Sequence, residues 1–276
     1  MHICLNRATA GAGLPLEQFV EIAANAGFPG ADVDLSYAVT HGVAALQDLY
    51  ASHKLRFGAW GIPFNWRSEQ INLEESLAKL SAFAKIAAQL ALDCCSTHIA
   101  SSSKLPFLEN WQFHVSRLRP CAQRLAEHGL RLGLEFLGPY EFRKLARHEF
   151  ISTPGVMLEL ADAIGPNVGL LVDSFHAHTS NTPWEYFAAL PAARIVLAHL
   201  NDAPDVPLHQ QKDGRRLLPG EGILDLNAFM NALRTAGYDG PVSVEVFSDE
   251  LRAMDPAEAA RRAWAATARA LPAYAS

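Results

Sequence analysis

Four side chains of metal-binding type follow strand-like apolar segments of this sequence. Glu135, Asp173, His199 and Glu245 each stand at or near the C-terminal end of such a segment. The intervals between them match the length of a strand plus its crossover helix. Such ends converge only where the strands lie side by side in parallel, so the spacing predicts one metal site and hence an enzyme. The segments are Leu132–Phe136, Val168–His176, Ile195–Asp202 and Val242–Phe247.

This ligand set favours one kind of chemistry. Three carboxylates and one imidazole suit a single divalent ion such as Mn, Mg, Co or Zn, and the set contains no thiolate. Such an ion can hold two adjacent substrate oxygens, polarise a ketone and acidify the neighbouring C–H. We expect Glu135 and Glu245 to move the proton, because a carboxylate can remove it and another acid can return it. The residues favour isomerisation of an aldose, ketose or other hydroxyketone, or its epimerisation.

Three further residues near predicted strand ends are candidates for substrate contacts. His176 follows Asp173 by three residues, and either projects into the pocket or caps a helix. His98 ends the fourth predicted strand, where it either lines the pocket or makes a core contact. Trp60 ends the third, where it either offers a sugar ring an apolar face or plugs the barrel. We expect all three in the substrate pocket.

The segment Asn201–Gly222 is long for a connection between a strand and a helix. Loops of this length in compact domains usually serve a function. Arg216 within it either reaches an anionic or polyhydroxyl substrate or pairs with Asp202 or Asp205. We expect Arg216 to contact substrate.

One repeated unit has to position these residues. An amphipathic helix, a glycine or polar break, and a short apolar run recur seven times along the chain, and with the opening strand and the closing helix make eight strands and eight helices. The strands are apolar almost throughout, as strands covered on both faces are. An open doubly wound sheet gives no reason for ligands on four consecutive strands. The pattern therefore predicts an α/β fold, a (β/α)8 TIM barrel forming a single domain over residues 1–276.

The predicted elements alternate strictly along the chain. The strands are Ile3–Asn6, Gly30–Asp34, Arg56–Trp60, Asp93–Ile99, Arg131–Glu135, Val168–Asp173, Ile195–Leu200 and Pro241–Glu245. The helices are Pro15–Asn25, Val43–His53, Leu73–Leu90, Trp111–His128, Pro154–Ile164, Pro183–Leu190, Leu226–Ala236 and Pro256–Leu271.

The bulk properties narrow the class of partner. A length of 276 residues suits one such barrel, and a net charge of −6 argues against nucleic-acid binding. The longest apolar region, Leu77–Cys95, is too polar to span a bilayer. No signal peptide is visible, and four cysteines without metal-type spacing indicate reduced thiols in a cytoplasm. We expect a cytoplasmic enzyme with a small-molecule substrate and no membrane partner. The sequence leaves open whether the protein forms a homo-oligomer.

The motifs around these residues resemble the sugar phosphate isomerase/epimerase superfamily, the xylose isomerase-like TIM barrels. The similarity runs over most of the chain, and its most specific parts are VDSFH and PGEG. Within the superfamily, the inosose isomerases (2-keto-myo-inositol isomerases) are the most similar group. The other matching stretches are ICLNRAT, GLEFLG, NVGLLVDSFHAHTSN, HLNDAPDVP, LPGEGILDL and GYDGPVSVEVF.

The resemblance implies a metal-dependent isomerase of inositol catabolism that acts on an inosose or keto-sugar through an enediolate. It also implies that His176 contacts substrate and that Arg216 is the arginine preceding the PGxG motif. One departure is Arg7, which stands where the inositol-type enzymes carry an acidic residue. Arg7 then either favours a substrate with a carboxylate or phosphate or pairs with an acidic neighbour such as Asp34. The metal ligands implied are Glu135, Asp173, His199 and Glu245.

Other functions share this resemblance. Ketose 3-epimerases, hydroxypyruvate isomerase and dehydroshikimate dehydratase are built on similar ligand sets. Abasic-site endonucleases of related fold use three zinc ions and an Asp-x-His pair after strand seven, which this sequence lacks. A barrel kept as a non-catalytic sugar-binding protein is the remaining alternative, and the complete ligand quartet argues against it.

Overall fold

The computed structural model describes residues 1–274, and its eight-stranded parallel sheet curls into the predicted barrel. The strand order is β3-β2-β1-β10-β9-β8-β6-β4, so neighbours are successive barrel strands, except that the first, β1, pairs with the last, β10. One bridge between Gly61 and Ser96 joins the two ends. There the backbone N–H of Ser96 donates to Trp60 O at 3.0 Å. The fold class predicted from the alternation is confirmed.

The barrel strands and an additional two-stranded antiparallel sheet have defined bounds. The barrel strands are β1 His2–Leu5, β2 Gly30–Ala31, β3 Arg56–Phe57, β4 Cys94–Ile99, β6 Arg131–Phe136, β8 Val168–Asp173, β9 Ile195–Leu200 and β10 Pro241–Val244. The antiparallel pair is β5 Ser102–Ser103 and β7 His148–Glu149.

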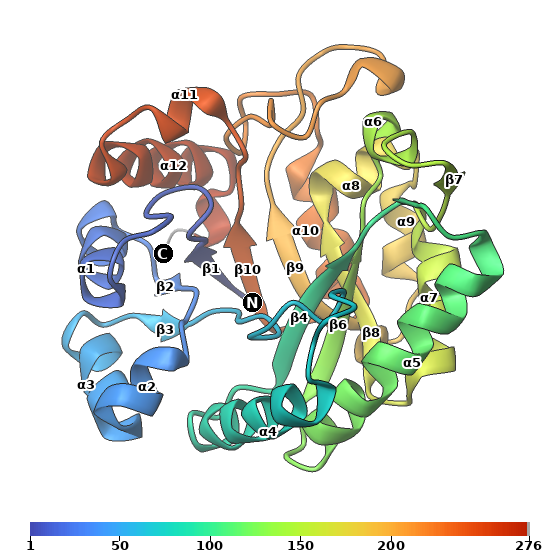
Figure 1. The fold of residues 1–276 in the computed structure, drawn as a ribbon. Coiled ribbons are helices and arrows are strands. Elements are labelled where there is room, and N and C mark those ends of the chain that lie inside the picture. Colours follow the sequence, from blue (N-terminus) through green and yellow to red (C-terminus); the bar gives the residue numbers. More distant parts are fainter. Residues whose placement is uncertain (275–276) are drawn as a thin grey trace.

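Helices surround the strands, from α1 and α12 on the left of Figure 1 to α5 and α7 on the right. The principal helices are α1 Leu16–Ala26, α3 Val43–Ser52, α4 Leu73–Gln89, α5 Phe107–Ala126, α7 Pro154–Ile164, α9 Trp184–Ala188, α10 Leu226–Thr235 and α12 Pro256–Ala270. Further helices are α2 Ser36–His41, α6 Tyr140–Arg143, α8 Ser174–Thr179 and α11 Asp249–Arg252, and three 3-10 turns are Ala192–Arg194, Leu208–Gln210 and Pro272–Tyr274.

Local chemistry at the helix ends explains several of these boundaries. The carboxylates of Asp225 and Asp255 accept backbone N–H groups in the first turns of α10 and α12. Gly27 ends α1 at φ 100°, a left-handed conformation that glycine adopts without strain. Across the described residues, no helix is long and apolar enough to cross a membrane.

The structure corrects several predicted boundaries. The helix predicted from Trp111 begins at Phe107, directly after Pro106, because proline suits the start of a helix. The second and third strands contain only two residues each and not the five predicted for each. Beyond Ala31 the carboxylate of Asp32 binds neighbouring segments, and the regular ladder gives way to separate hydrogen bonds.

The two halves of the barrel therefore differ. Strands β4, β6, β8 and β9 have six residues each, and all six residues of β8 and of β9 are buried. The half formed by β1, β2 and β3 has shorter strands, and loops complete its wall. The long, buried strands provide the more rigid support for side chains at their ends.

Candidate metal centre

The four predicted ligands meet at the C-terminal ends of adjacent strands. Asp173 is the last residue of β8 and pairs in register with His199 of β9. Glu135 is the fifth residue of β6, and Glu245 follows β10 directly. One ligand-type atom from each residue lies within 4.8 Å of the others. Parallel pairing brings residues far apart in sequence to the same edge of the sheet.

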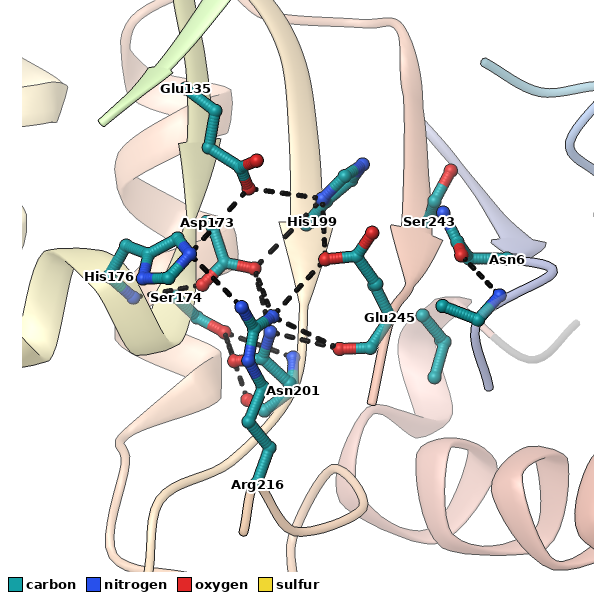
Figure 2. Close-up of polar contacts among 12 residues, drawn as sticks. Asn6, Glu135, Asp173, Ser174, His176, His199, Asn201, Arg216, Ser243 and Glu245 are labelled. Carbon is teal, nitrogen blue, oxygen red and sulfur yellow. Dashed lines mark hydrogen bonds and ion pairs between the residues drawn. The ribbon is translucent and has the colours of Figure 1, made fainter. Parts of the chain in front are cut away.

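The ligand-type atoms around His199 are close together, and two of them are unpaired within the described chain. Its Nδ1 lies 3.4 Å from Glu135 Oε1, 3.2 Å from Glu245 Oε2 and 4.0 Å from Asp173 Oδ2 (Figure 2). Among the described residues, neither His199 Nδ1 nor Glu135 Oε1 has a hydrogen-bond partner, although both atoms are buried. Buried polar atoms are normally satisfied. Three oxygen donors and one nitrogen donor around one point fit a divalent cation.

The pKa shifts of the clustered residues also indicate a site for a cation. Burial raises the pKa of Glu135 above its ordinary value. Burial also acts to raise the pKa of Glu245, but His199 and Arg216 outweigh it and hold that pKa at about 2. Burial acts to lower the pKa of His199, yet Glu245 and Glu135 raise it well above the ordinary value. The negative field that attracts a proton to His199 also attracts a metal cation.

Asp173 is held by a network behind the donor atoms. It is fully buried, and its Oδ1 accepts the backbone N–H of His176 at 2.8 Å. Its Oδ2 accepts from Asn201 Nδ2 at 2.7 Å and from Arg216 Nη1 at 3.0 Å. Asn201 is fixed in turn by Ser174 Oγ, which donates to Asn201 Oδ1 at 2.8 Å. Such outer contacts orient a ligand before any cation binds.

Arg216 extends this network to Glu245 and to a fourth carboxylate. Its Nη1 lies 3.2 Å from Glu245 Oε2, and its Nη2 lies 2.6 Å from Asp213 Oδ1. Nη2 also lies 3.0 Å from His176 Nε2, which therefore accepts because a guanidinium only donates. Burial lowers the pKa of His176 to about 4, which matches a neutral, accepting ring.

A cavity of about 410 Å³ opens onto the metal-ligand cluster. Glu135, His199 and Glu245 form part of its wall, and Trp60 and His98 also line it. Its shape places three of the four donor residues in reach of a small molecule. Further lining residues are Asn6, Arg7, Asp32, Trp66 and Arg67.

The comparisons with known proteins agree with this architecture. A sequence profile described as xylose isomerase-like TIM barrel matches residues 9–271. The chain belongs to this family. An inosose isomerase from Bacillus velezensis is 25% identical to this barrel over 259 residues, which are 91% of this chain and 90% of that protein.

Two solved structures of similar fold extend the comparison. A xylose isomerase domain protein from Alicyclobacillus acidocaldarius matches with a TM-score of 0.89 at 28% identity, over 100% of this chain and 99% of that chain. The IolI protein with a bound zinc atom matches with a TM-score of 0.78 at 23% identity, over 99% of each chain. The family resemblance seen in the sequence motifs is confirmed.

The structure of this xylose isomerase-like barrel separates the predicted substrate residues into two groups. Trp60 and His98 line the cavity. His176 and Arg216 do not line it, and the side chain of each is only 1% exposed. In this structure His176 and Arg216 contact the carboxylates of the cluster. Their predicted contact with substrate stays a prediction.

Two ion pairs considered from the sequence do not form among the described residues. Arg216 pairs with Asp213 and not with Asp202 or Asp205. Asp202 is fully buried and accepts backbone N–H groups from Ala203, Gly220, Gly222 and Leu224 at 2.8–3.0 Å. These bonds fold the loop that carries Arg216.

The Arg7–Asp34 pair is likewise absent from the described ion pairs. Arg7 donates from Nη2 to the backbone carbonyl of Leu14 and lies over the ring of Phe19. Asp34 accepts from the backbone and hydroxyl of Ser36 instead.

Sequence reasoning missed several residues that build the site. Asn201 and Asp213 support the cluster, and Asp32 lines the cavity. Burial raises the pKa of Asp32 to about 6, and its Oδ1 accepts from Ser243 Oγ at 2.6 Å. A polar residue at the end of an apolar strand was the available signal for Asp32 and Asn201. Asp213 stands only three residues before Arg216, so their pairing is local, but nothing in the sequence shows that the loop brings this pair to the cluster.

Proposed function

We propose that this protein is a divalent-metal-dependent isomerase or epimerase of a polyhydroxy ketone, an inosose or keto-sugar. The observation that carries the proposal is the convergence of Glu135, Asp173, His199 and Glu245 on one point beside a cavity. Support also comes from the inosose isomerase of B. velezensis and from the zinc bound by the IolI protein. The cytoplasmic location and a homo-oligomeric state stay predictions.

The four residues would hold the cation, with Zn, Mn, Mg and Co as candidates. A bound divalent cation supplies Lewis acidity, which polarises a carbonyl and acidifies the adjacent C–H. The support network of Asn201 and Arg216 orients Asp173 for this task. Trp60 and His98 lie on the cavity wall, where they would contact the carbon skeleton and hydroxyl groups of the substrate.

Proton transfer falls to the two glutamates. Glu245, whose pKa His199 and Arg216 hold at about 2 against the effect of burial, is ionised and suited to remove a proton next to the carbonyl. Glu135, the other glutamate of the cluster, would return a proton to the resulting enediolate. Two carboxyl groups beside one substrate can share the tasks of removing and returning a proton. Return to the former carbonyl carbon, with the hydroxyl proton passing from one oxygen to the other, gives isomerisation. Return to the opposite face of the original carbon gives epimerisation.

The test is exchange with solvent. Inososes and ketoses are incubated in D2O with the protein and Mn²⁺ or Zn²⁺, and deuterium beside the carbonyl is measured by NMR. We expect incorporation that EDTA abolishes and added metal restores. Product analysis then separates isomerase from epimerase. Glu127→Gln, which alters an exposed carboxylate of the Arg124 ion pair, is the matched control and should exchange normally.

Absence of exchange with every ketone, in protein shown by metal analysis to hold a cation, would contradict the proposal. Retention of metal together with tight sugar binding but no exchange would favour a non-catalytic sugar-binding barrel.

A further inference from the structure

Two arginines line the cavity on the half of the barrel mouth that carries no predicted metal ligand. Arg7 follows β1, and Arg67 lies in the segment between β3 and α4. The donor cluster lies at the ends of β6, β8, β9 and β10, on the other half of the barrel. A molecule that fills the cavity therefore meets carboxylates at one end and guanidinium groups at the other.

Both arginines are held in the same manner. The guanidinium of Arg7 lies 5.0 Å from the centre of the Phe19 ring, and that of Arg67 lies 4.1 Å from the centre of the Trp66 ring. Each also donates one Nη2 hydrogen bond to a backbone carbonyl, of Leu14 or of His98. Stacking and one hydrogen bond fix the orientation of a guanidinium before a ligand arrives.

Neither arginine has a carboxylate partner among the ion pairs of the described chain. Arg7 Nη1 and Arg67 Nε are buried and make no hydrogen bond within the described residues. Burial lowers the pKa of Arg67 to about 10, so the side chain is cationic at neutral pH. A partly buried cation without a counter-ion is costly, so this arrangement needs a reason.

Asp32 is the acidic residue of this half of the cavity, and its oxygens are already engaged. Oδ1 accepts from Ser243 Oγ and from Ala59 N at 2.6 and 2.9 Å, and Oδ2 accepts from Asn6 Nδ2 at 2.8 Å. Asp32 therefore does not neutralise the two arginines by direct contact.

We propose that the substrate carries an anionic group, a carboxylate or a phosphate, which Arg7 and Arg67 bind while the rest of the molecule faces the donor cluster. The four carboxylates of the other half do not engage these arginines, because Asp173, Asp213 and Glu245 pair with Arg216 and Glu135 lies in the metal-ligand cluster. Arg7 and Arg67 are therefore left for the ligand. Guanidinium groups bind carboxylate and phosphate through paired hydrogen bonds.

Anion binding is tested without turnover. Inorganic phosphate is titrated into the purified protein by calorimetry, and the same titration is run on Arg7→Gln and Arg67→Gln. We expect each substitution to weaken binding about tenfold or more, because a hydrogen bond to a charged group is lost. The matched control is Arg117→Gln, since Arg117 stacks on Phe113 at 5.5 Å but does not line the cavity. Phosphate affinity equal in all four proteins would overturn the proposal.

The second part of the proposal, that the bound anion belongs to the substrate, rests on the proposed function. Its test needs substrates that share one carbon skeleton. D-Fructose, D-fructose 6-phosphate and D-fructuronate differ in a neutral hydroxyl, a phosphate or a carboxylate at one position. We expect faster deuterium exchange with one of the two anionic ketoses, and Arg7→Glu should lower the anionic-to-neutral ratio of kcat/KM about tenfold. The preferred anion distinguishes phosphate from carboxylate.

The outcomes separate the two proposals. A preference for D-fructose that Arg7→Glu leaves unchanged would refute the anionic substrate and leave the isomerase standing. Arginine-dependent phosphate binding without exchange of any ketone would support the anion site and count against the isomerase.

Discussion

The two halves of the barrel mouth hold their arginine side chains in different ways. On the half formed by β6, β8, β9 and β10, Arg216 is buried and contacts Asp173, Asp213 and Glu245. On the half formed by β1, β2 and β3, Arg7 and Arg67 contact rings and backbone carbonyls, and no ion pair joins them to an acid of the described chain. The first arrangement completes a charge network within the protein, whereas the second leaves charge available for a ligand.

The elements that support the side chains also differ between the two halves. Fully buried six-residue strands carry Asp173 and His199, so their positions vary little. Arg67 depends on a loop that Trp66 anchors through its hydrogen bond to Thr97 Oγ1 at 2.9 Å. Reaction chemistry needs precise geometry, and substrate selection tolerates variation in loops. We call the side formed by β6, β8, β9 and β10 the strand half, and the side that carries Arg7 and Arg67 the loop half. We infer that the strand half performs the reaction and that the loop half selects the substrate.

The largest expected effect lies on the strand half. Glu245→Gln should retain some metal while turnover falls by about 10²–10⁴-fold, the usual scale for loss of general acid–base catalysis. The measurements are kcat by deuterium exchange and metal content by elemental analysis. Near-normal turnover with metal bound would make Glu245 a ligand only, and the base would have to be sought elsewhere.

Arg216→Met tests whether this half is a closed charge network. Removing one partner of a buried ion pair costs about 3–5 kcal/mol, because the carboxylates of Asp173 and Asp213 lose their counter-charge. Urea unfolding should show this loss of stability, and Mn²⁺ should restore part of it by supplying positive charge. Arg215→Met, an exposed neighbour, is the control and should change little. Equal losses in both variants would mean that the network contributes no stability.

The loop half is expected to be sensitive to acid. Burial lowers the pKa of His114 to about 4 from 6.5, and its ring packs 5.2 Å from that of Trp66. The unfolded chain takes up the proton first, so this contribution is intact above about pH 6.5 and is lost as the pH falls toward 4. Between pH 7 and pH 5 the loss is about 2 kcal/mol.

Unfolding by urea at both pH values measures this effect. His114→Gln should show a smaller drop in stability than the wild type, while His209→Gln, at an exposed site, should behave like the wild type. The same pH dependence in all three proteins would assign the acid sensitivity to other groups.

The smallest effect concerns the anchor of the loop. Thr97→Val preserves shape but leaves the Trp66 indole N–H buried without an acceptor, at a cost of about 1–2 kcal/mol. Because Arg67 stacks on Trp66, phosphate affinity should fall a few-fold while metal affinity stays constant. A change in metal affinity instead would show that the two halves are not independent. Ser116→Ala, which removes a hydroxyl on the exposed side of α5, controls for loss of a side-chain hydrogen bond.

The sequence by itself determined the barrel and the convergence of its four ligand-type residues. Strict alternation of strand and helix leaves a parallel sheet as the natural arrangement, and the C-terminal ends of such strands share one edge. Glu135, Asp173, His199 and Glu245 could therefore be brought together from spacing alone, and the structure places their donor atoms within 4.8 Å.

Only the tertiary structure decided what surrounds them. The substrate contacts predicted for Arg216 and His176 stay predictions. No feature of the sequence indicated that the 201–222 loop, folded around Asp202, brings Arg216 to Asp173 and His176. The sequence likewise left Arg67 unmarked and Arg7 with Asp34 as a possible partner. The physical reason is that the regular hydrogen bonds of the sheet fix the positions of the strand ends. Loop side chains obtain theirs from contacts between distant segments, which no local pattern of the sequence records.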